Sequence, residues 1–316
     1  MTTPNDHDHP DERPIAEPPQ RVSGMRVPES WSLLGKPPEL AADADDAWRQ
    51  TGFVLGEDLR LLAANLDLQV RLAATGYQVA ARTMRMAAVA SMWSRALLTT
   101  SDAAHLARLG SYQSSLGLVR QATEFFAAER GLASDPAAWE AFKAWSHRGY
   151  ATHAPTRSDE IGLGNYFAGE EIARDPVLRL IYRGASDLAR PNFGASALFA
   201  AAEANHQRYP LVFGDRAFHL GWAELILGWL LHLGAAQLHF ALHASVLFPA
   251  GPDLRDEVVR NARAIEAHLS PPASDAGAAQ VPRCRLEEYV DEDGRRRHLL
   301  IDFRRRTGDA TKRILL

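Results

Sequence analysis

The sequence predicts an all-α protein: a multi-helix bundle with a long central apolar helix, a disordered N-terminal tail and a small C-terminal β-hairpin. Three observations support this fold class. Apolar residues recur at alternating spacings of three and four over much of the chain, which is typical of helices that pack against neighbours. Residues 225–248 contain no Asp, Glu, Lys or Arg. Near the C-terminus the hydrophobic period changes to two, which indicates strands.

Residues 1–45 are expected to form the disordered tail. They are rich in proline and charge, and such a composition buries too little apolar surface to offset the entropy cost of ordering. The first residues lack the apolar core and basic end of a secretory signal. A single cysteine, Cys284, cannot form an internal disulfide, so we expect a reducing, cytoplasmic location.

Residues 50–270 are assigned to one helical bundle domain. Short joints between its first helices indicate antiparallel neighbours. An N-cap at Thr99–Ser101 is expected to separate the second helix from the third, which Gly131 would end. Helix starts are expected near Gly56, Val79, Thr99, Pro136, Pro176, Phe193, Asp215 and Asp253.

A Pro/Ala/Gly linker over 271–282 is followed by a C-terminal β-hairpin and basic tail over 283–316. Two alternating runs, Cys284–Val290 and Arg297–Phe303, flank the turn sequence Asp291–Gly294. Two isolated strands are marginally stable in water, so the hairpin is expected to pack on the helices or on a partner.

The apolar segment around 217–248 is long enough to span a bilayer. Three histidines and a glutamine lie within it, and its flanks show no Lys/Arg asymmetry. A helix that is apolar on every side also suits the centre of a bundle. We therefore predict a core helix rather than a membrane span.

Three histidines of this helix, His232, His239 and His243, fall within roughly 20° of one line on its surface. Two imidazoles at i, i+4 can bind one metal ion, so the stripe could be a divalent-metal or acid–base site. The alternative is the polar edge of an otherwise apolar helix. No matching ligand set is evident elsewhere, so we favour the polar edge and expect no cofactor.

A Glu-x-x-His motif at Glu203 and His206 is a second candidate for metal ligation. In di-iron bundles this spacing supplies two ligands from one turn of helix. Such sites need a second copy of the motif and two further glutamates, and the sequence does not supply that set.

Two segments carry a family resemblance. Arg120 and Glu124 form an Arg-x3-Glu, and Tyr182 and Ser186 form a Tyr-x3-Ser. Their order resembles that in a bacterial group of helical proteins with HEPN-like character, over about residues 76–250. The chain departs from that pattern at Arg190, where a histidine is expected. The Arg120–Glu124 pair has a plainer interpretation as a surface i, i+4 salt bridge.

HEPN-type ribonucleases use an arginine and a histidine four to six residues apart on an RNA phosphate. Arg263 and His268 have such a spacing late in a helix, which makes them the candidate catalytic residues. With 12 histidines and many arginines in the chain, a few such pairs are expected by chance.

No complete catalytic set can be assembled from these motifs. With a net charge of −4, the protein has no overall positive field that would attract nucleic acid, and its sequence contains no DNA-binding motif. RNA remains a candidate ligand. We therefore expect a helical binding or interaction protein, in a bacterial stress or defence system, with a protein partner or a second copy of itself. The alternative is an enzyme: a HEPN-like ribonuclease or a His-based metal-dependent hydrolase.

Overall fold

The computed structural model describes most of the helical region and only part of the chain ends. The described residues are 27–76, 83–150, 168–191, 213–245 and 247–269, together with the backbone of three strands, 285–290, 297–303 and 312–315. For residues 136 and 145–150 the backbone alone is described. The expected helix at 193–205 and the expected turn at 291–294 lie outside the described residues, as do residues 1–26.

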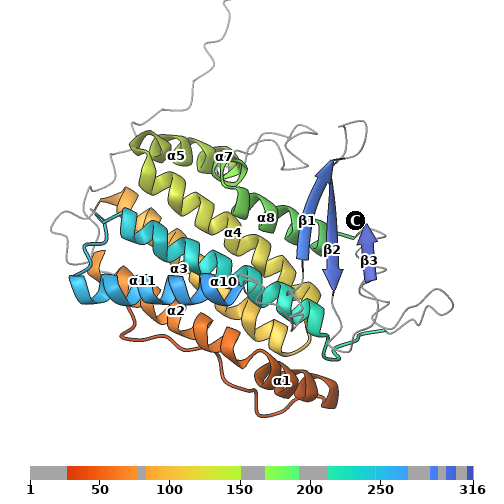
Figure 1. Ribbon diagram of the computed structural model, residues 1–316. Helices are drawn as coiled ribbons and strands as arrows, with labels where there is room; N and C mark the ends of the chain where they lie inside the picture. Colours follow the sequence, from red (N-terminus) through yellow and green to blue (C-terminus); the bar gives the residue numbers. More distant parts are fainter. Residues whose placement is uncertain are drawn as a thin grey trace, which may run out of the picture.

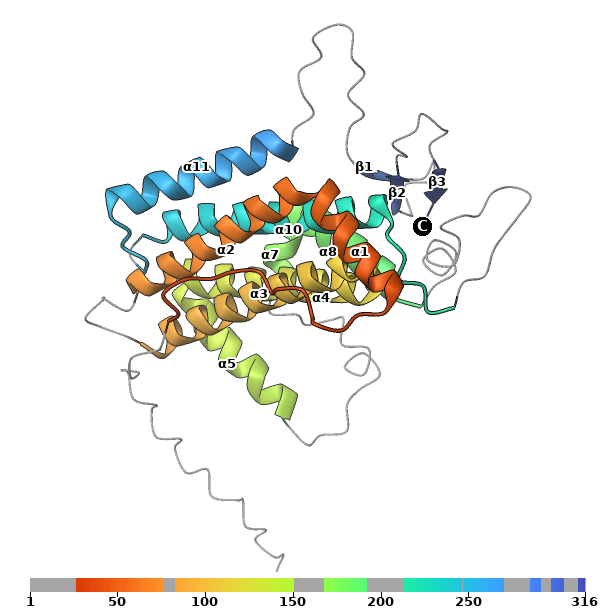
Figure 2. The ribbon, with the colours of Figure 1, turned by 90° about the horizontal axis from the view of Figure 1, so that it is seen from below.

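Nine α-helices make up the described helical region, which confirms the prediction of a mostly helical protein with one long apolar helix. They are α1 (Ala42–Val54), α2 (Gly56–Gly76), α3 (Met84–Arg108), α4 (Tyr112–Ser134), α5 (Pro136–Tyr150), α7 (Gly169–Arg174), α8 (Pro176–Ala189), α10 (Leu220–His243) and α11 (Pro252–Leu269). Most of them run side by side (Figure 1). Figure 2 shows α11 on one side of the bundle, α3 and α4 towards the other, and α2 and α10 between them.

Two expected boundaries in the first half of the bundle are wrong. The expected N-cap at Thr99–Ser101 lies inside α3, because all three side chains are buried and the Thr99 hydroxyl donates to the Arg95 carbonyl at 2.7 Å. The chain turns instead at Gly110, whose φ of 72° suits glycine. Helix α4 also continues through Gly131 to Ser134.

Helix α1 has no counterpart among the expected helices. Its buried face consists of Ala44, Ala47, Trp48 and Thr51, so only one large apolar side chain marks the helical period. This weak pattern is difficult to recognise before its partner is known. Trp48 meets the His105 ring of α3 edge-on, with 5.5 Å between the ring centroids.

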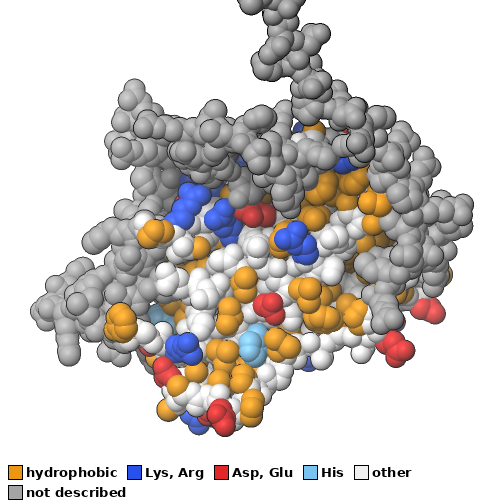
Figure 3. Space-filling view, turned by 180° about the vertical axis from the view of Figure 1, so that it is seen from behind, with side chains coloured by type: hydrophobic (Ala, Val, Ile, Leu, Met, Phe, Trp, Pro, Cys, Tyr) orange, Lys and Arg blue, Asp and Glu red, His pale blue; other side chains and the backbone are white. Residues whose placement is uncertain are grey.

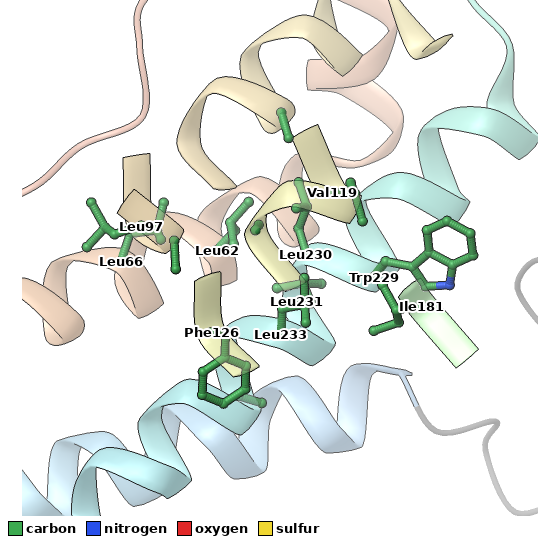
Figure 4. Packing of buried hydrophobic residues seen from close by; sticks show 14 of the residues in the cluster. Leu62, Leu66, Leu97, Val119, Phe126, Ile181, Trp229, Leu230, Leu231 and Leu233 are labelled. Atoms are coloured by element: carbon green, nitrogen blue, oxygen red, sulfur yellow. The ribbon is translucent and has the colours of Figure 1, made fainter. Parts of the chain in front are cut away.

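Helix α10 is shorter than the expected 217–248 segment, and it forms the centre of the core. His219 caps it in place of the expected Asp215, whose carboxylate accepts from the Ala217 N–H ahead of the helix. Side chains of α2, α3, α4, α8 and α11 surround α10, and Leu230 and Leu231 are fully buried among them (Figure 4). By length and composition α10 could cross a membrane, yet 67% of its most apolar window is buried inside the protein. The prediction of a core helix agrees with this burial.

A chain of buried amide groups connects three helices beside α10. The Trp93 indole N–H donates to Gln69 Oε1 at 2.8 Å, and Gln69 Nε2 donates to Asn65 Oδ1 at 2.8 Å. Asn65 Nδ2 then donates to Asn261 Oδ1 at 3.0 Å, which joins α2 to α11. Gly234 of α10 faces this chain closely, because a Cβ there would lie 2.4 Å from Asn65 Oδ1. The missing side chain at position 234 therefore leaves room for the amides.

Gly234→Ala is expected to lower the free energy of unfolding by about 1–3 kcal/mol, since its methyl group displaces the Asn65 amide. Gly228→Ala in the same helix is the matched control: its Cβ would meet only Leu269 Cδ2, at 4.0 Å, so the better helix propensity should stabilise by about 0.5–1 kcal/mol. Urea unfolding of the three proteins measures both effects. Equal stability changes in the two variants would contradict the packing argument.

A buried carboxyl group joins α4 to α10. Glu129 is fully buried, and Gln237 Nε2 donates to its Oε1 at 2.7 Å. Burial raises the pKa of Glu129 well above its ordinary value, against the hydrogen bond from Gln237 and the charge of Arg130. Glu129 Oε2 and Gln237 Oε1 have no other partner among the described residues. The raised pKa favours the protonated, neutral form of this carboxyl group, which avoids an uncompensated charge in the core.

Glu129→Gln is expected to remove a pH dependence of stability. The raised pKa means that the folded protein binds the proton more tightly, so wild-type stability falls as pH rises from the unfolded pKa, about 4.3, towards the folded one. The slope from this group is at most about 1.4 kcal/mol per pH unit, and a neutral amide removes it. Urea unfolding between pH 4 and 8 should show that the free energy of unfolding of the variant increases relative to that of wild type as pH rises. A constant difference would contradict the neutral carboxyl.

At the C-terminus the backbone traces three strands, β1 (Arg285–Val290), β2 (Arg297–Phe303) and β3 (Lys312–Leu315). They follow the order β1-β2-β3, and both pairs are antiparallel, with Leu286 opposite Ile301 and Ile301 opposite Ile314. Packing of the expected hairpin on the helices stays a prediction, since the side chains of these strands are not described.

Candidate functional site

A seam of polar contacts joins the antiparallel helices α2 and α11, and the candidate residue His268 lies at one end of it. Arg71 binds the Glu257 carboxylate through both terminal nitrogens at one end, and Asn65 binds Asn261 in the middle. His268 Nε2 lies 3.2 Å from Asp58 Oδ2 at the other end. The seam fixes the register of the two helices with hydrogen bonds and ion pairs.

The Asp58–His268 pair combines a buried carboxylate with a partly exposed imidazole. The Asp58 side chain is 1% exposed and that of His268 is 20% exposed. Asp58 lies in the first turn of α2 and His268 in the last turn of α11, so each helix dipole favours the charge of its residue. A buried carboxylate beside an imidazole orients the ring, as acid–base catalysis requires.

Arg263 does not join this pair. It is exposed on α11, and five residues of helix rotate it by about 140° from His268. Among the described residues, the partner of His268 in space is thus Asp58, from a helix about 200 residues earlier in the chain. Arg263 and His268 both stay candidate catalytic residues, but they lie on different faces of α11.

The three histidines of α10 have separate surroundings. His239 Nε2 lies 3.1 Å from Glu266 Oε1 on α11, and His243 Nδ1 donates to the His239 carbonyl at 2.7 Å. The His232 side chain has exposed surface, yet partial desolvation lowers its pKa. No group of three His, Cys, Asp or Glu side chains that could hold a metal ion occurs within the described part of the chain. Glu203 and His206 lie outside it.

The two segments of the family resemblance meet in space between α4 and α8. Arg120 Nε donates to Glu124 Oε1 at 3.2 Å within α4. The Tyr182 hydroxyl of α8 lies close enough to the same carboxylate to lower the pKa of Glu124, and the Arg120 guanidinium lies 5.7 Å from the Tyr182 ring centroid. We refer to Arg120, Glu124 and Tyr182 as the α4–α8 cluster.

The α4–α8 cluster is half-buried rather than a solvated surface pair. The Arg120 and Glu124 side chains are only 26% and 19% exposed. Burial raises the pKa of Glu124, although the charge and hydrogen bond of Arg120 and the nearby Tyr182 hydroxyl oppose the rise. Such a pair contributes little to stability, because much of its Coulomb energy offsets desolvation.

A second ion-pair group lies along the same side of α4. Arg130 Nη1 donates to Asp175 Oδ2 at 2.6 Å, and Arg130 Nε lies 3.7 Å from Glu171 Oε2. Asp175 also caps α8 by accepting from Val177 and Leu178 N–H groups. Burial alone would raise the pKa of Asp175, but the hydrogen bonds from Arg130 and the cap outweigh it and lower the pKa. These contacts hold α7 and α8 against α4 and so position Tyr182.

Asp58 and Tyr182 are polar partners that sequence reasoning did not pair with the candidate residues. Asp58 is an ordinary first-turn acidic residue in the sequence, and nothing there distinguishes it from Glu57 beside it. Tyr182 belongs to a motif, but its distance in sequence from Glu124 gives no sign of contact. These residues come together only when α2 packs on α11 and α4 packs on α8.

No protein-family model, no curated protein and no solved structure matches this chain. The resemblance to HEPN-like helical proteins therefore stays a prediction, and the site has to be interpreted from its own geometry.

Proposed function

We propose that this protein is a helical binding or interaction protein of a bacterial stress or defence system, and that it contacts its partner through the α4–α8 cluster. The observation that carries the proposal is the convergence of Arg120, Glu124 and Tyr182 in one half-buried group. Stability alone gives no reason to keep charges in such a position.

Residue chemistry supports recognition as the role of this cluster. Arginine and tyrosine are enriched among the residues that contribute most to binding, because each combines a large contact area with directed hydrogen bonds. Glu124 holds both side chains in place through its carboxylate. A preorganised Arg and Tyr lose little conformational entropy when a partner binds.

The surface on the side away from α11 also supports an interaction role. In Figure 3, hydrophobic side chains are spread among uncharged ones on the described part of this face, with Lys, Arg, Asp and Glu side chains scattered between them. Elsewhere among the described residues, Leu98 of α3 is 45% exposed, and the Arg95 guanidinium lies 4.1 Å from the Phe125 ring centroid. Exposed apolar groups among charges of both signs suit a protein partner or a second copy better than RNA, which favours a strongly basic surface.

The proposal predicts that Arg120→Gln weakens partner binding by at least tenfold, the size expected for a central recognition residue. The full-length protein should be cross-linked in its native cells to identify a partner, and binding of the purified pair then measured by calorimetry. Analytical ultracentrifugation measures self-association and so tests whether the partner is a second copy of the protein. Arg60→Gln is the matched control, because it breaks the exposed Arg60–Glu57 pair on α2. Equal affinities of the two variants would contradict the proposal.

A ribonuclease is the second candidate, and the Asp58–His268 contact is the observation that favours it. His268 would act as the general acid or base, oriented by Asp58, while Arg263 would have to reach the phosphate from about 140° around α11. A His-based metal hydrolase has no comparable cluster within the described residues.

If the protein is a ribonuclease, purified wild-type protein should cleave RNA, and both His268→Ala and Asp58→Asn should lower the rate by at least about tenfold. Arg263→Ala tests the arginine in the same assay. Metal analysis of the active protein distinguishes a metal-independent ribonuclease from a metal-dependent hydrolase. No cleavage by wild type, or cleavage that survives His268→Ala and Arg263→Ala, would reject the enzyme.

A further inference from the structure

The central helix α10 begins at an unusual capping residue, a histidine. His219 has extended backbone angles, and its Nδ1 accepts a hydrogen bond from the Trp222 N–H at 3.2 Å. The common N-cap residues Ser, Thr, Asp and Asn accept through an oxygen that does not change charge near neutral pH. A histidine can accept at Nδ1 only while the ring is neutral and its proton is on Nε2.

The same residue connects α10 to the turn between α3 and α4. The His219 backbone N–H donates to the Tyr112 hydroxyl at 3.0 Å, at the start of α4. Gly110 in that turn approaches the chain ahead of α10 so closely that a Cβ would lie 2.0 Å from the Arg216 carbonyl oxygen. The cap therefore lies at a tightly packed junction, where fraying of α10 also affects its contact with α4.

Protonation of the imidazole removes the cap for two reasons. Nδ1 then carries a hydrogen and cannot accept, so the Trp222 N–H loses its acceptor within a residue that is only 2% exposed. The new positive charge also lies at the positive end of the helix dipole. Because the capped form requires a neutral ring, its stabilisation is present while the ring is neutral and is lost as falling pH adds a proton to it.

From this geometry we propose that His219 is a pH-sensitive cap, which releases the first turn of α10 from the α3–α4 junction on mild acidification.

Among the described residues, the other ionisable groups near His219 do not account for a change between pH 7.5 and 5.5. Tyr112 faces it from α4, and burial raises the pKa of Tyr112 to about 12, so the hydroxyl keeps its proton. Asp215 and Arg216 lie on the lead-in segment, and Glu224 lies in the first turns of α10. Carboxylates ordinarily titrate below pH 5 and guanidinium groups above pH 12, outside the range in which histidine changes charge.

The Trp222 amide provides a direct readout. As one of the first four N–H groups of the helix, it has no backbone acceptor within α10, and the His219 ring is the acceptor that it contacts. Hydrogen exchange of the full-length protein, measured by NMR and normalised for the intrinsic pH dependence, should show protection at Trp222 falling about fivefold between pH 7.5 and 5.5. Amides in the middle of α10 should keep their protection.

Two substitutions test the role of the ring. His219→Asn retains a capping acceptor that does not titrate, so protection at Trp222 should stay high at both pH values. His219→Ala removes the acceptor, so protection should be low at both. The proposal is overturned if wild-type protection at Trp222 is the same at pH 7.5 and 5.5, or if His219→Asn shows the wild-type pH dependence. If His219→Ala does not fold, the comparison of wild type with His219→Asn still shows whether the His219 ring causes the pH dependence.

Discussion

Removal of helix α10 from water is the interaction on which the bundle depends. Its side chains are apolar on nearly every side, and α2, α3, α4, α8 and α11 surround it. Burying a single leucine side chain contributes roughly 1.5–3 kcal/mol, so a row of them on one helix supplies a large share of the driving force for folding. Each surrounding helix needs only one apolar face, which explains why the remaining helices are amphipathic while α10 is not.

This arrangement imposes a second requirement, because the polar groups next to α10 must find partners inside the core. Gln237 donates a hydrogen bond to Glu129, whose pKa is raised by burial, and Gly234 leaves space for the amides of Asn65 and its neighbours. Directed hydrogen bonds of this kind contribute less energy than burial, but they select one register among several that hydrophobic packing alone would permit.

The outer contacts of the bundle have a different character, and the candidate sites are found there. Asp58–His268 lies where the ends of α2 and α11 meet, and the α4–α8 cluster lies where two motif segments pack together. Both combine a shielded carboxylate with a partly exposed partner. Proximity to the surface leaves these partners accessible to a ligand, while the buried carboxylate holds their orientation. The His219 junction adds a point at which charge can change the contact between α10 and α4.

The sequence by itself determined the helical class, the core position of α10 and several helix starts, including those at Gly56 and Pro176, because hydrophobic period and proline act over a few residues. It did not locate α1, whose buried face is mostly alanine, or the turn at Gly110, because the buried Thr99–Ser101 segment resembles a cap. Only the tertiary structure decided the partners: Asp58 for His268, Tyr182 for Glu124, and separate surroundings for His232, His239 and His243. Local patterns carry no information about contacts between residues far apart in the chain, since those depend on how the helices pack.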